Sequence, residues 1–255
     1  MFPYTWAQRR GRSTDCESLL TALSDRLRTA GFTGLLTGQG RQSAGAVARA
    51  RRFRQLVGRF PNLEDMRVVD LGGEAQTWIE AQVRPREVVL LNIPWMARSQ
   101  QERLDEQGLG WIRAVGGDAC DPPAELTEQR CDLVFSNSVI EHVGGHQRRA
   151  AFADAVHRLA PHHWVQTPNR YFPIEPHWLF PGFQFLPARG RAEVQRRWPV
   201  GHFAALRGKQ DDRDRMRDVL EVELVSKSEL RWYFPDSEIL AERVGPMTKS
   251  WIVVR

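Results

Sequence analysis

Short apolar runs alternate with amphipathic segments along the middle of the chain. The apolar runs cover residues 66–71, 87–93, 111–115, 131–137 and 163–169, and segments with helical spacing separate them. Strands that are apolar on both faces, alternating with helices, are typical of a parallel sheet built from right-handed βαβ units. The pattern predicts a doubly wound, mostly parallel α/β sheet that binds its ligand at the carboxyl ends of the strands.

Further elements are predicted on either side of this alternation. Two helices precede the first strand, over 15–30 and 43–60, within an N-terminal helical extension of residues 1–62. A helix, a strand, a turn and a last strand end the chain, over 226–234, 237–244, 245–246 and 249–255. Two strands joined by so short a turn pair antiparallel, so we expect a seven-stranded sheet with an antiparallel C-terminal edge strand.

The alternation stops after the fifth apolar run. The stretch of about 171–225 is rich in proline and aromatic residues and then in charge. A structureless loop of that length is uncommon unless it has a function. We therefore expect an insertion over the sheet edge or the mouth of the site, within a single domain that covers residues 1–255.

The composition indicates the cellular compartment in which we expect the protein. Apolar residues at 42% and charged residues at 26% are typical of a globular protein, and no apolar run is long enough to span a membrane. The N-terminus lacks the apolar core of a signal peptide, so we expect a cytoplasmic protein. Cys16, Cys120 and Cys131 lack disulfide or zinc spacing and are expected to be free thiols.

Arginine supplies most of the positive charge that gives the chain its net charge of +5. It clusters in one segment, at Arg41, Arg49, Arg51, Arg52, Arg54 and Arg59. Such a cluster can steer an anionic partner such as nucleic acid, or it can be the solvated face of a helix. The second interpretation is favoured, because arginine is enriched along the whole chain and base-stacking aromatics are few nearby. Nucleic-acid binding is therefore not expected.

The first strand ends in a glycine turn, in the sequence VVDLGGEAQTW. Gly72 and Gly73 allow a tight turn and a close approach of backbone N–H groups to a nucleoside ligand. Glu74 and Gln76 replace glycines of a dinucleotide fingerprint, and a glutamate would repel a pyrophosphate. An oxidoreductase using NAD or FAD is disfavoured, and a cofactor without phosphates is favoured. About 20 residues on, where an acid commonly binds ribose, Asn92 offers an amide oxygen.

Three motifs together carry a resemblance to a known family. They are VVDLGG, then GDACD at 117–121, then CDLVFSNSVIEHVG at 131–144. In this order and spacing they resemble the class I S-adenosylmethionine-dependent methyltransferases, in particular the small-molecule branch known as type 11. The resemblance covers about residues 66–170, and the closing pair of strands also resembles that family. It implies a Rossmann-like methyltransferase fold with S-adenosylmethionine as cofactor.

The resemblance also implies roles for individual residues. Asp70, Gly72 and Gly73 would hold the amino-acid end of the cofactor, and Asn92 and Ile93 the ribose and adenine. Asp118 would accept from the adenine amino group beside Ala119, while Asn137 and Ser138 would line the methionine side. Plainer roles stay open, because Asp70 can simply order the glycine turn and Asp118 can be a turn residue before the double proline.

Two histidines are candidates for a catalytic base. Methyl transfer from a sulfonium needs a base only if the acceptor must lose a proton, and a histidine can take one near neutral pH. His142 follows the fourth strand directly, and His177 lies in the aromatic insertion, where it could face the substrate with Asn169 and Tyr171. The adjacent His162 and His163 would point to opposite faces of a strand and could not readily share an ion, so no metal is expected.

The sequence thus predicts methyl transfer to a small molecule in one direct step. The aromatic insertion suggests an apolar or aromatic acceptor, although its aromatic residues can equally form a small core of their own. The altered glycine turn and the missing ribose acid leave one alternative, a catalytically inert methyltransferase-like binding or partner protein. The acceptor atom and the oligomeric state cannot be read from the sequence.

Overall fold

The computed structural model describes residues 44–198, 201 and 209–255, and the helix predicted over 15–30 and Cys16 lie outside them. The chain divides into two compact units, which we describe separately. The sheet unit consists of Arg49–Pro173 and Leu220–Arg255. The insert unit has Ile174–Val219 as its main part and also takes in the first turn of one helix, at 44–48.

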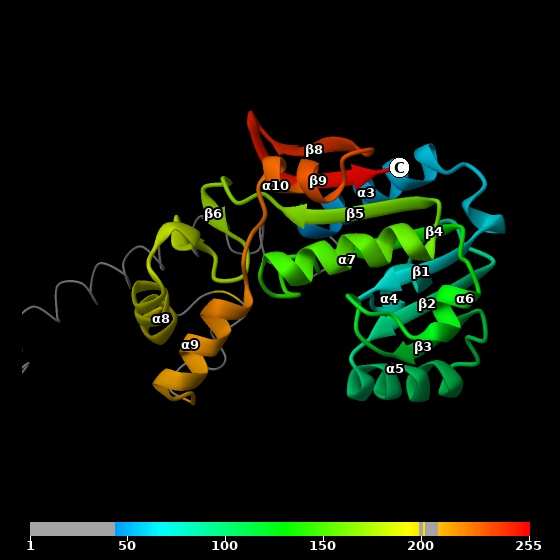
Figure 1. The fold of residues 1–255 in the computed structure, drawn as a ribbon, viewed down its shortest axis with the longest axis horizontal. Helices are drawn as coiled ribbons and strands as arrows, with labels where there is room; N and C mark the ends of the chain where they lie inside the picture. The colour runs from blue at the N-terminus through cyan, green and yellow to red at the C-terminus, as the bar shows by residue number, and fades with distance from the viewer. Residues whose placement is uncertain (1–43, 199–200, 202–208) are drawn as a thin grey trace, which may run out of the picture. The chain divides into compact units, whose positions relative to one another are not determined.

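The sheet unit is built on seven strands (Figure 1). They are β1 (Arg67–Leu71), β2 (Glu87–Asn92), β3 (Ile112–Gly116), β4 (Leu133–Asn137), β5 (His162–Pro168), β8 (Glu238–Val244) and β9 (Met247–Val254). Their order is β3-β2-β1-β4-β5-β9-β8, parallel from β3 to β5, while β9 runs antiparallel to both of its neighbours. The predicted doubly wound sheet with an antiparallel C-terminal edge is confirmed.

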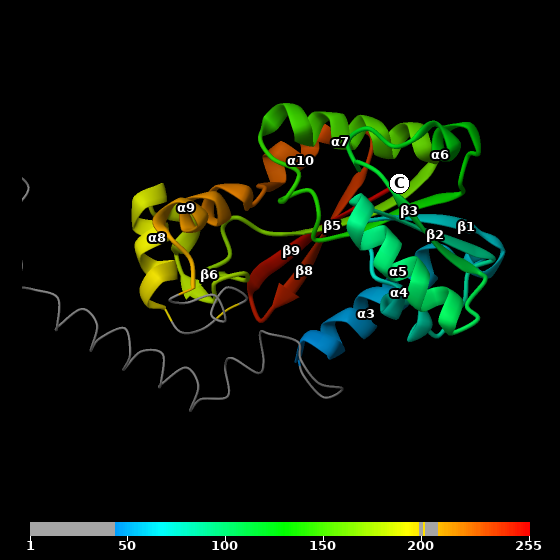
Figure 2. The ribbon, with the colours of Figure 1, turned by 90° about the horizontal axis from the view of Figure 1, so that it is seen from below.

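Helices cover both faces of this sheet (Figure 2). One face carries α3 (Ala44–Arg59), α4 (Ala75–Ile79) and α5 (Pro94–Glu106), and the short η1 (Leu63–Asp65) precedes β1. The other face carries α6 (Ala124–Glu128), α7 (His146–Leu159) and α10 (Lys227–Tyr233). Because both faces are covered, β1, β2 and β4 are buried along nearly their whole length, which explains their continuous apolar runs.

Most predicted elements agree with the structure. The helices expected over 43–60 and 226–234 are α3 and α10, and the second of these begins with a capping box between Ser226 and Glu229. The segment with helical spacing after β1 is α4, which begins directly after the glycine turn at Ala75 and ends at Ile79.

The insert unit has its own small apolar core. Its elements are β6 (Ile174–Glu175), β7 (Phe180–Pro181), η2 (Phe183–Phe185), α8 (Ala188–Arg197) and α9 (Asp212–Glu221), of which the last ends in the sheet unit. The ring of Trp178 stacks on Phe183 with centroids 4.2 Å apart, and Phe180 meets Trp198 edge-on at 5.0 Å. These aromatic residues therefore pack on one another, as the second interpretation of the insertion expected.

Other sequence expectations concern the thiols and the membrane. Cys120 and Cys131 are both free and buried, and burial raises the pKa of each thiol to about 11, so neither is a reactive thiolate at neutral pH. Among the described residues, none of the helices has the length and apolar character that crossing a bilayer requires.

The two adjacent histidines of β5 point to opposite faces, as expected for a strand. His162 contacts Phe60 on the α3 face, whereas His163 is fully buried on the other face against Phe234. The Nε2 atom of His163 lies 2.9 Å from the Ser237 hydroxyl. Burial is the main cause that lowers the pKa of His163, from 6.5 to about 3.

This buried histidine makes stability depend on pH. Between pH 6.5 and 3 the unfolded chain binds a proton at residue 163 that the folded chain does not, so His163 lowers stability as the pH falls, by up to about 1.4 kcal/mol per pH unit. In His163→Phe, the urea midpoint should therefore fall less steeply from pH 7 to pH 4 than in the wild type. The exposed His162→Phe is the control, and equal pH slopes in both variants would contradict this role.

Candidate functional site

The strand order reverses between β1 and β4. In open α/β sheets, ligands bind at the carboxyl ends of the strands beside such a reversal. Residues singled out from the sequence end or follow the four adjacent strands β3, β2, β1 and β4, in register with one another. The sheet therefore brings the nine predicted cofactor residues to one edge, although they span about 70 residues of sequence.

Asp70 is buried beneath the glycine turn. Its side chain is 1% exposed, and its Oδ2 accepts a hydrogen bond of 2.8 Å from the indole N–H of Trp78 on α4. A Cβ atom added to Gly73 would lie 1.9 Å from that same Oδ2. Gly72 adopts φ +74°, and a Cβ there would lie 2.6 Å from a methyl group of Val139. Both glycines are therefore required, the first by its backbone angle and both by close packing.

The second strand supports the turn from the side. The Asn92 amide nitrogen donates to the Gly73 carbonyl at 2.8 Å, and Gln100 on α5 donates to the same oxygen at 3.2 Å. Since the nitrogen of Asn92 is turned toward Gly73, its oxygen is the atom directed elsewhere and can accept a hydrogen bond. Ile93 follows immediately and is 49% exposed, which offers an apolar surface beside that oxygen.

Asp118 follows the third strand and is held by an arginine. Arg148 at the start of α7 makes a bidentate pair with it, at 2.7 and 2.8 Å, and the Cys120 amide donates to Oδ1. The hydrogen bond from Arg148 is the main cause that lowers the pKa of Asp118, so the group is a carboxylate at neutral pH. Two carboxylate oxygens can accept about four hydrogen bonds, so Asp118 keeps capacity on Oδ2 for one more donor. Ala119 is next and is partly buried.

The end of β4 is the most constrained part of this edge. Ser138 adopts φ +59°, a left-handed conformation that is costly for a residue with a side chain and that clusters at functional sites. Its hydroxyl donates to Gln166 on β5 at 3.0 Å, and its amide donates to the Gln166 carbonyl. Strand β5 therefore holds Ser138 at two points.

Arg52 of α3 joins this same corner. Its guanidinium donates to Asn137 Oδ1 and makes a bidentate ion pair with Glu242 of β8, at 3.1 and 3.2 Å. The side chains of Arg52 and Glu242 are only 11% and 10% exposed. Neither sequence interpretation of the arginine cluster fits this residue, since it is neither solvated nor available to an anionic partner. Removing one member of so buried a pair leaves an uncompensated charge and is costly.

The two candidate bases lie in different units. His142 belongs to the sheet unit, is exposed, and closes a turn in which its amide donates to Val139 at 2.8 Å. His177 belongs to the insert unit and is 8% exposed. The buried Glu175 accepts from its Nδ1 at 2.7 Å and from the backbone amides of His177 and Trp178. Glu175 therefore fixes the orientation and tautomer of His177.

Comparison with known proteins agrees with this geometry. The family model described as "Methyltransferase domain" matches residues 70–165, the stretch that contains the four strand ends. No curated protein matches the chain. Residues 70–165, which make up less than half of the chain, match the methyltransferase domain family.

Solved structures share the fold of this methyltransferase. The N-terminal domain of EvdMO1, crystallised in the presence of SAH and D-fucose, is 16% identical, covers 81% of each chain and has a TM-score of 0.50. Magnesium protoporphyrin IX methyltransferase (ChlM) from Synechocystis PCC 6803, with bound SAH, is 14% identical, covers 92% of this chain and 97% of its own, and has a TM-score of 0.50. The predicted Rossmann-like fold is confirmed, and the family match agrees with the predicted class I methyltransferase that uses S-adenosylmethionine.

The residues at the carboxyl ends of β1 to β4 fit S-adenosylmethionine. Asp70 Oδ1 is buried and has no hydrogen-bond partner among the described residues, an unsatisfied acceptor beneath the turn. S-adenosylmethionine carries an ammonium group at its amino-acid end and has no phosphate, which agrees with a turn that ends in Glu74. The nearby exposed Ile93 and the oxygen of Asn92 match the apolar and hydroxylated parts of an adenosine.

Several residues of this site were not found from the sequence. Arg52 lies one helical turn before the fully buried Leu56, so an arginine on the apolar stripe of a helix was a usable signal. Gln166 and Arg148 gave no such signal, because each meets its partner across 28 or 30 residues of sequence. Glu175 was overlooked, although a carboxylate two residues before a histidine can orient it in a turn.

Asp70 should make the stability of the methyltransferase fall as the pH rises. Burial is the main cause that raises its pKa from 3.8 to about 8, so the folded chain holds a proton that the unfolded chain releases. Stability is then lost between pH 4 and 8, by up to about 1.4 kcal/mol per pH unit. Asp70→Asn has no group that titrates at this position, so its thermal midpoint should depend less on pH over this range. The control Asp236→Asn, which removes an exposed carboxylate, should keep the pH dependence of the wild type. A wild-type pH slope in Asp70→Asn would refute the buried proton.

Gly73 should tolerate no side chain. Gly73→Ala forces a Cβ into the Asp70 carboxylate and should cost about 1–3 kcal/mol of unfolding free energy, because neither the carboxylate nor its Trp78 partner can move freely. The matched change Gly58→Ala adds a Cβ in open space within α3 and should stabilise by about 0.5–1 kcal/mol. Equal urea midpoints for the two variants would contradict the packing described for the turn.

Proposed function

We propose that this protein transfers the methyl group of S-adenosylmethionine to a small-molecule acceptor in one direct step. The observation that carries the proposal is the glycine turn, packed onto a buried carboxylate beside the reversal of strand order. A turn of that kind gives a nucleoside cofactor a close approach to backbone N–H groups without requiring a phosphate. The family match over the same residues supports it.

The cofactor residues divide the edge between them. The backbone of Gly72 and Gly73 would hold the amino-acid end, with Asp70 acting through the turn that it supports. The Asn92 oxygen would accept from a ribose hydroxyl, and Ile93 would cover one face of the adenine. Oδ2 of Asp118 would accept from the adenine amino group, with the Ala119 backbone alongside. Asn137 and Ser138 would line the methionine side.

Alignment is the main task of this chain in the reaction. When bound, S-adenosylmethionine supplies a methyl carbon already activated by a positively charged sulfur. One bond forms between the acceptor atom and that carbon as the carbon–sulfur bond breaks, and the electron pair stays on sulfur, so no acid is needed. The bonds that fix Asn137 and Ser138 to Arg52 and Gln166 keep this end of the site rigid, which lowers the entropic part of the barrier.

A base is needed only for an acceptor that must lose a proton. His142 and His177 remain the candidates. Donation from Nδ1 of His177 to Glu175 makes Nε2 the basic nitrogen of that tautomer, so Nε2 is the atom that would take the acceptor's proton. A carboxylate partner also stabilises the imidazolium that results.

Calorimetric titration with S-adenosylmethionine and with S-adenosylhomocysteine tests the proposal. The wild type should bind both at about micromolar concentration, and Asp118→Ala should bind about tenfold more weakly, equivalent to about 1.4 kcal/mol. Asp154→Ala removes an exposed carboxylate from α7 and should bind as the wild type does.

The opposite result has a definite meaning. A chain that keeps its thermal midpoint but binds neither compound would overturn the catalytic proposal. That result would favour the alternative that the altered glycine turn suggests, a catalytically inert methyltransferase-like partner protein.

A further inference from the structure

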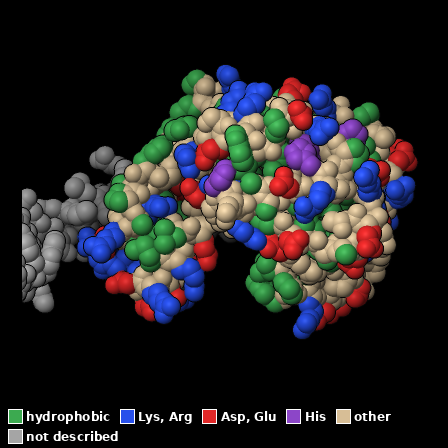
Figure 3. Space-filling view, viewed as in Figure 1, with side chains coloured by type: hydrophobic (Ala, Val, Ile, Leu, Met, Phe, Trp, Pro, Cys, Tyr) green, Lys and Arg blue, Asp and Glu red, His purple; other side chains and the backbone are tan. Residues whose placement is uncertain are grey.

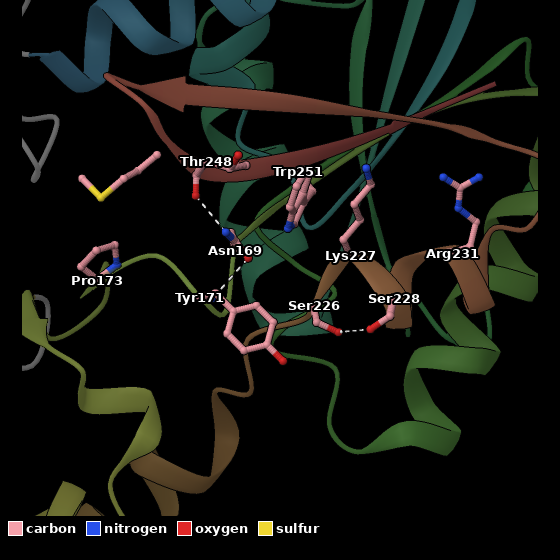
Figure 4. A pocket seen from close by; sticks show the side chains of 10 residues that line it. Asn169, Tyr171, Pro173, Ser226, Lys227, Ser228, Arg231, Thr248 and Trp251 are labelled. Atoms are coloured by element: carbon pink, nitrogen blue, oxygen red, sulfur yellow. Dashed lines mark hydrogen bonds between the residues drawn. The ribbon is translucent and has the colours of Figure 1, made fainter.

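A concavity lies on the sheet unit beside α10 and the start of β9 (Figure 4). It encloses about 770 Å³ and is lined by the segment after β5, the start of β9 and the exposed side of α10. All of its lining residues belong to the sheet unit, so the pocket is complete within that unit. It opens beside the carboxyl end of β5, on the same edge of the sheet as Ser138 and Gln166.

One part of this pocket is aromatic. Trp251 of β9 packs on the core of the sheet unit and is fixed there, while Tyr171 is 66% exposed. Asn169 holds the backbone between them, because its amide donates to the Thr248 carbonyl at 2.8 Å and its oxygen accepts from the Tyr171 amide at 3.2 Å. The two rings therefore line the same pocket, which suits a flat apolar group.

The other part is cationic. Lys227 and Arg231 lie one helical turn apart on α10, and both line the pocket (Figure 4). Within the described part of the chain, neither of them forms an ion pair with a carboxylate, and the residues lining the pocket include no acid. The ammonium of Lys227 lies 5.2 Å from the centre of the Trp251 ring, so charge and aromatic surface adjoin. Ser228 adds a hydroxyl on the same helix.

The aromatic part and the cationic part of the pocket lie side by side, and this combination differs from the mixed charges elsewhere on the surface. Figure 3 shows that acidic and basic side chains are interspersed over the face it presents. Two cations without an acidic partner, next to aromatic rings that line the same pocket, suit an anionic ring compound. Ring stacking supplies apolar contact, and the cations supply charge-assisted hydrogen bonds to a carboxylate or phosphate.

We infer that this pocket binds a planar aromatic compound bearing an anionic group, with the ring against Trp251 and Tyr171 and the anion on Lys227 and Arg231. The inference rests on the proposed function, for which it names the class of methyl acceptor. The anion anchors the acceptor at α10, so the atom to be methylated lies on the part of the ring farther from the anion.

Fluorescence titration of the full chain, without cofactor, tests the inference. Three probes share one ring system: 3-hydroxy-2-naphthoate, 2-naphthyl phosphate and the neutral 2-naphthol. At low salt, at least one anionic probe should bind about tenfold or more tightly than 2-naphthol, and added salt should shrink this difference. The stronger anion identifies carboxylate or phosphate. Equal affinity of 2-naphthol and both anions would overturn the inference.

Variants place the binding on the pocket. The double change Lys227→Gln with Arg231→Gln should remove the preference for the anionic probes and leave the affinity for 2-naphthol unchanged. Trp251→Leu should weaken all three probes by about the same factor. Arg130→Gln, an exposed arginine before β4, is the matched control and should behave as the wild type does. An unchanged preference in the double variant, with an unchanged thermal midpoint, would refute the assignment to α10.

The two proposals fail in distinguishable ways. If S-adenosylhomocysteine binds but the anionic probes show no preference, the methyltransferase stands and this acceptor class falls. If the probes show the preference but S-adenosylhomocysteine does not bind, the proposed reaction falls and the pocket remains a site for aromatic anions.

Discussion

The carboxyl group of Asp70, buried against Gly73, shapes the turn at the end of β1 and so the edge at which the candidate cofactor residues meet. The last residues of β1 must turn directly above that carboxylate, which leaves room only for hydrogen at the position of the Gly73 side chain. Trp78 and Asn92 then hold the turn from two sides, one through the carboxylate and the other through the Gly73 carbonyl. A buried acid is costly, and a buried acid of raised pKa beneath a glycine turn is typical of a functional site.

The same edge is tied together over long distances in sequence. Arg52 connects α3 to Asn137 of β4 and to Glu242 of β8, and Gln166 connects β5 to Ser138. Helix α3 is therefore tied to the edge that carries the candidate cofactor residues. The arginine cluster suggested a solvated surface, but Arg52 of that cluster forms a buried ion pair. The buried ion pair contributes little net stability, because the cost of desolvating both charges offsets most of their attraction. Its role is then to fix how α3 packs against β4 and β8.

The sequence was sufficient for the sheet and for the edge at which the candidate site residues meet. Periodicity identified the strands because each is buried on both faces, and parallel strands bring their carboxyl ends together without further information. It was insufficient for the partners of the site residues. The tie between Asp118 and Arg148, and the direction in which the Asn92 amide turns, depend on helices that approach from elsewhere in the chain. Of the residues that line the pocket on α10, Asn169 and Tyr171 were expected beside the substrate, whereas Lys227 and Arg231 were not singled out, because they come from a helix much later in the chain.

We propose that adenosine and the amino-acid end of the cofactor occupy the edge formed by the carboxyl ends of β1 to β4. A crystal structure of the complex with S-adenosylhomocysteine is the decisive experiment. We expect the adenine between Ile93 and Ala119, a ribose hydroxyl on the Asn92 oxygen and the amino-acid end on the backbone of Gly72 and Gly73. A ligand bound elsewhere, with Gly72 and Gly73 making no contact to it, would overturn this assignment.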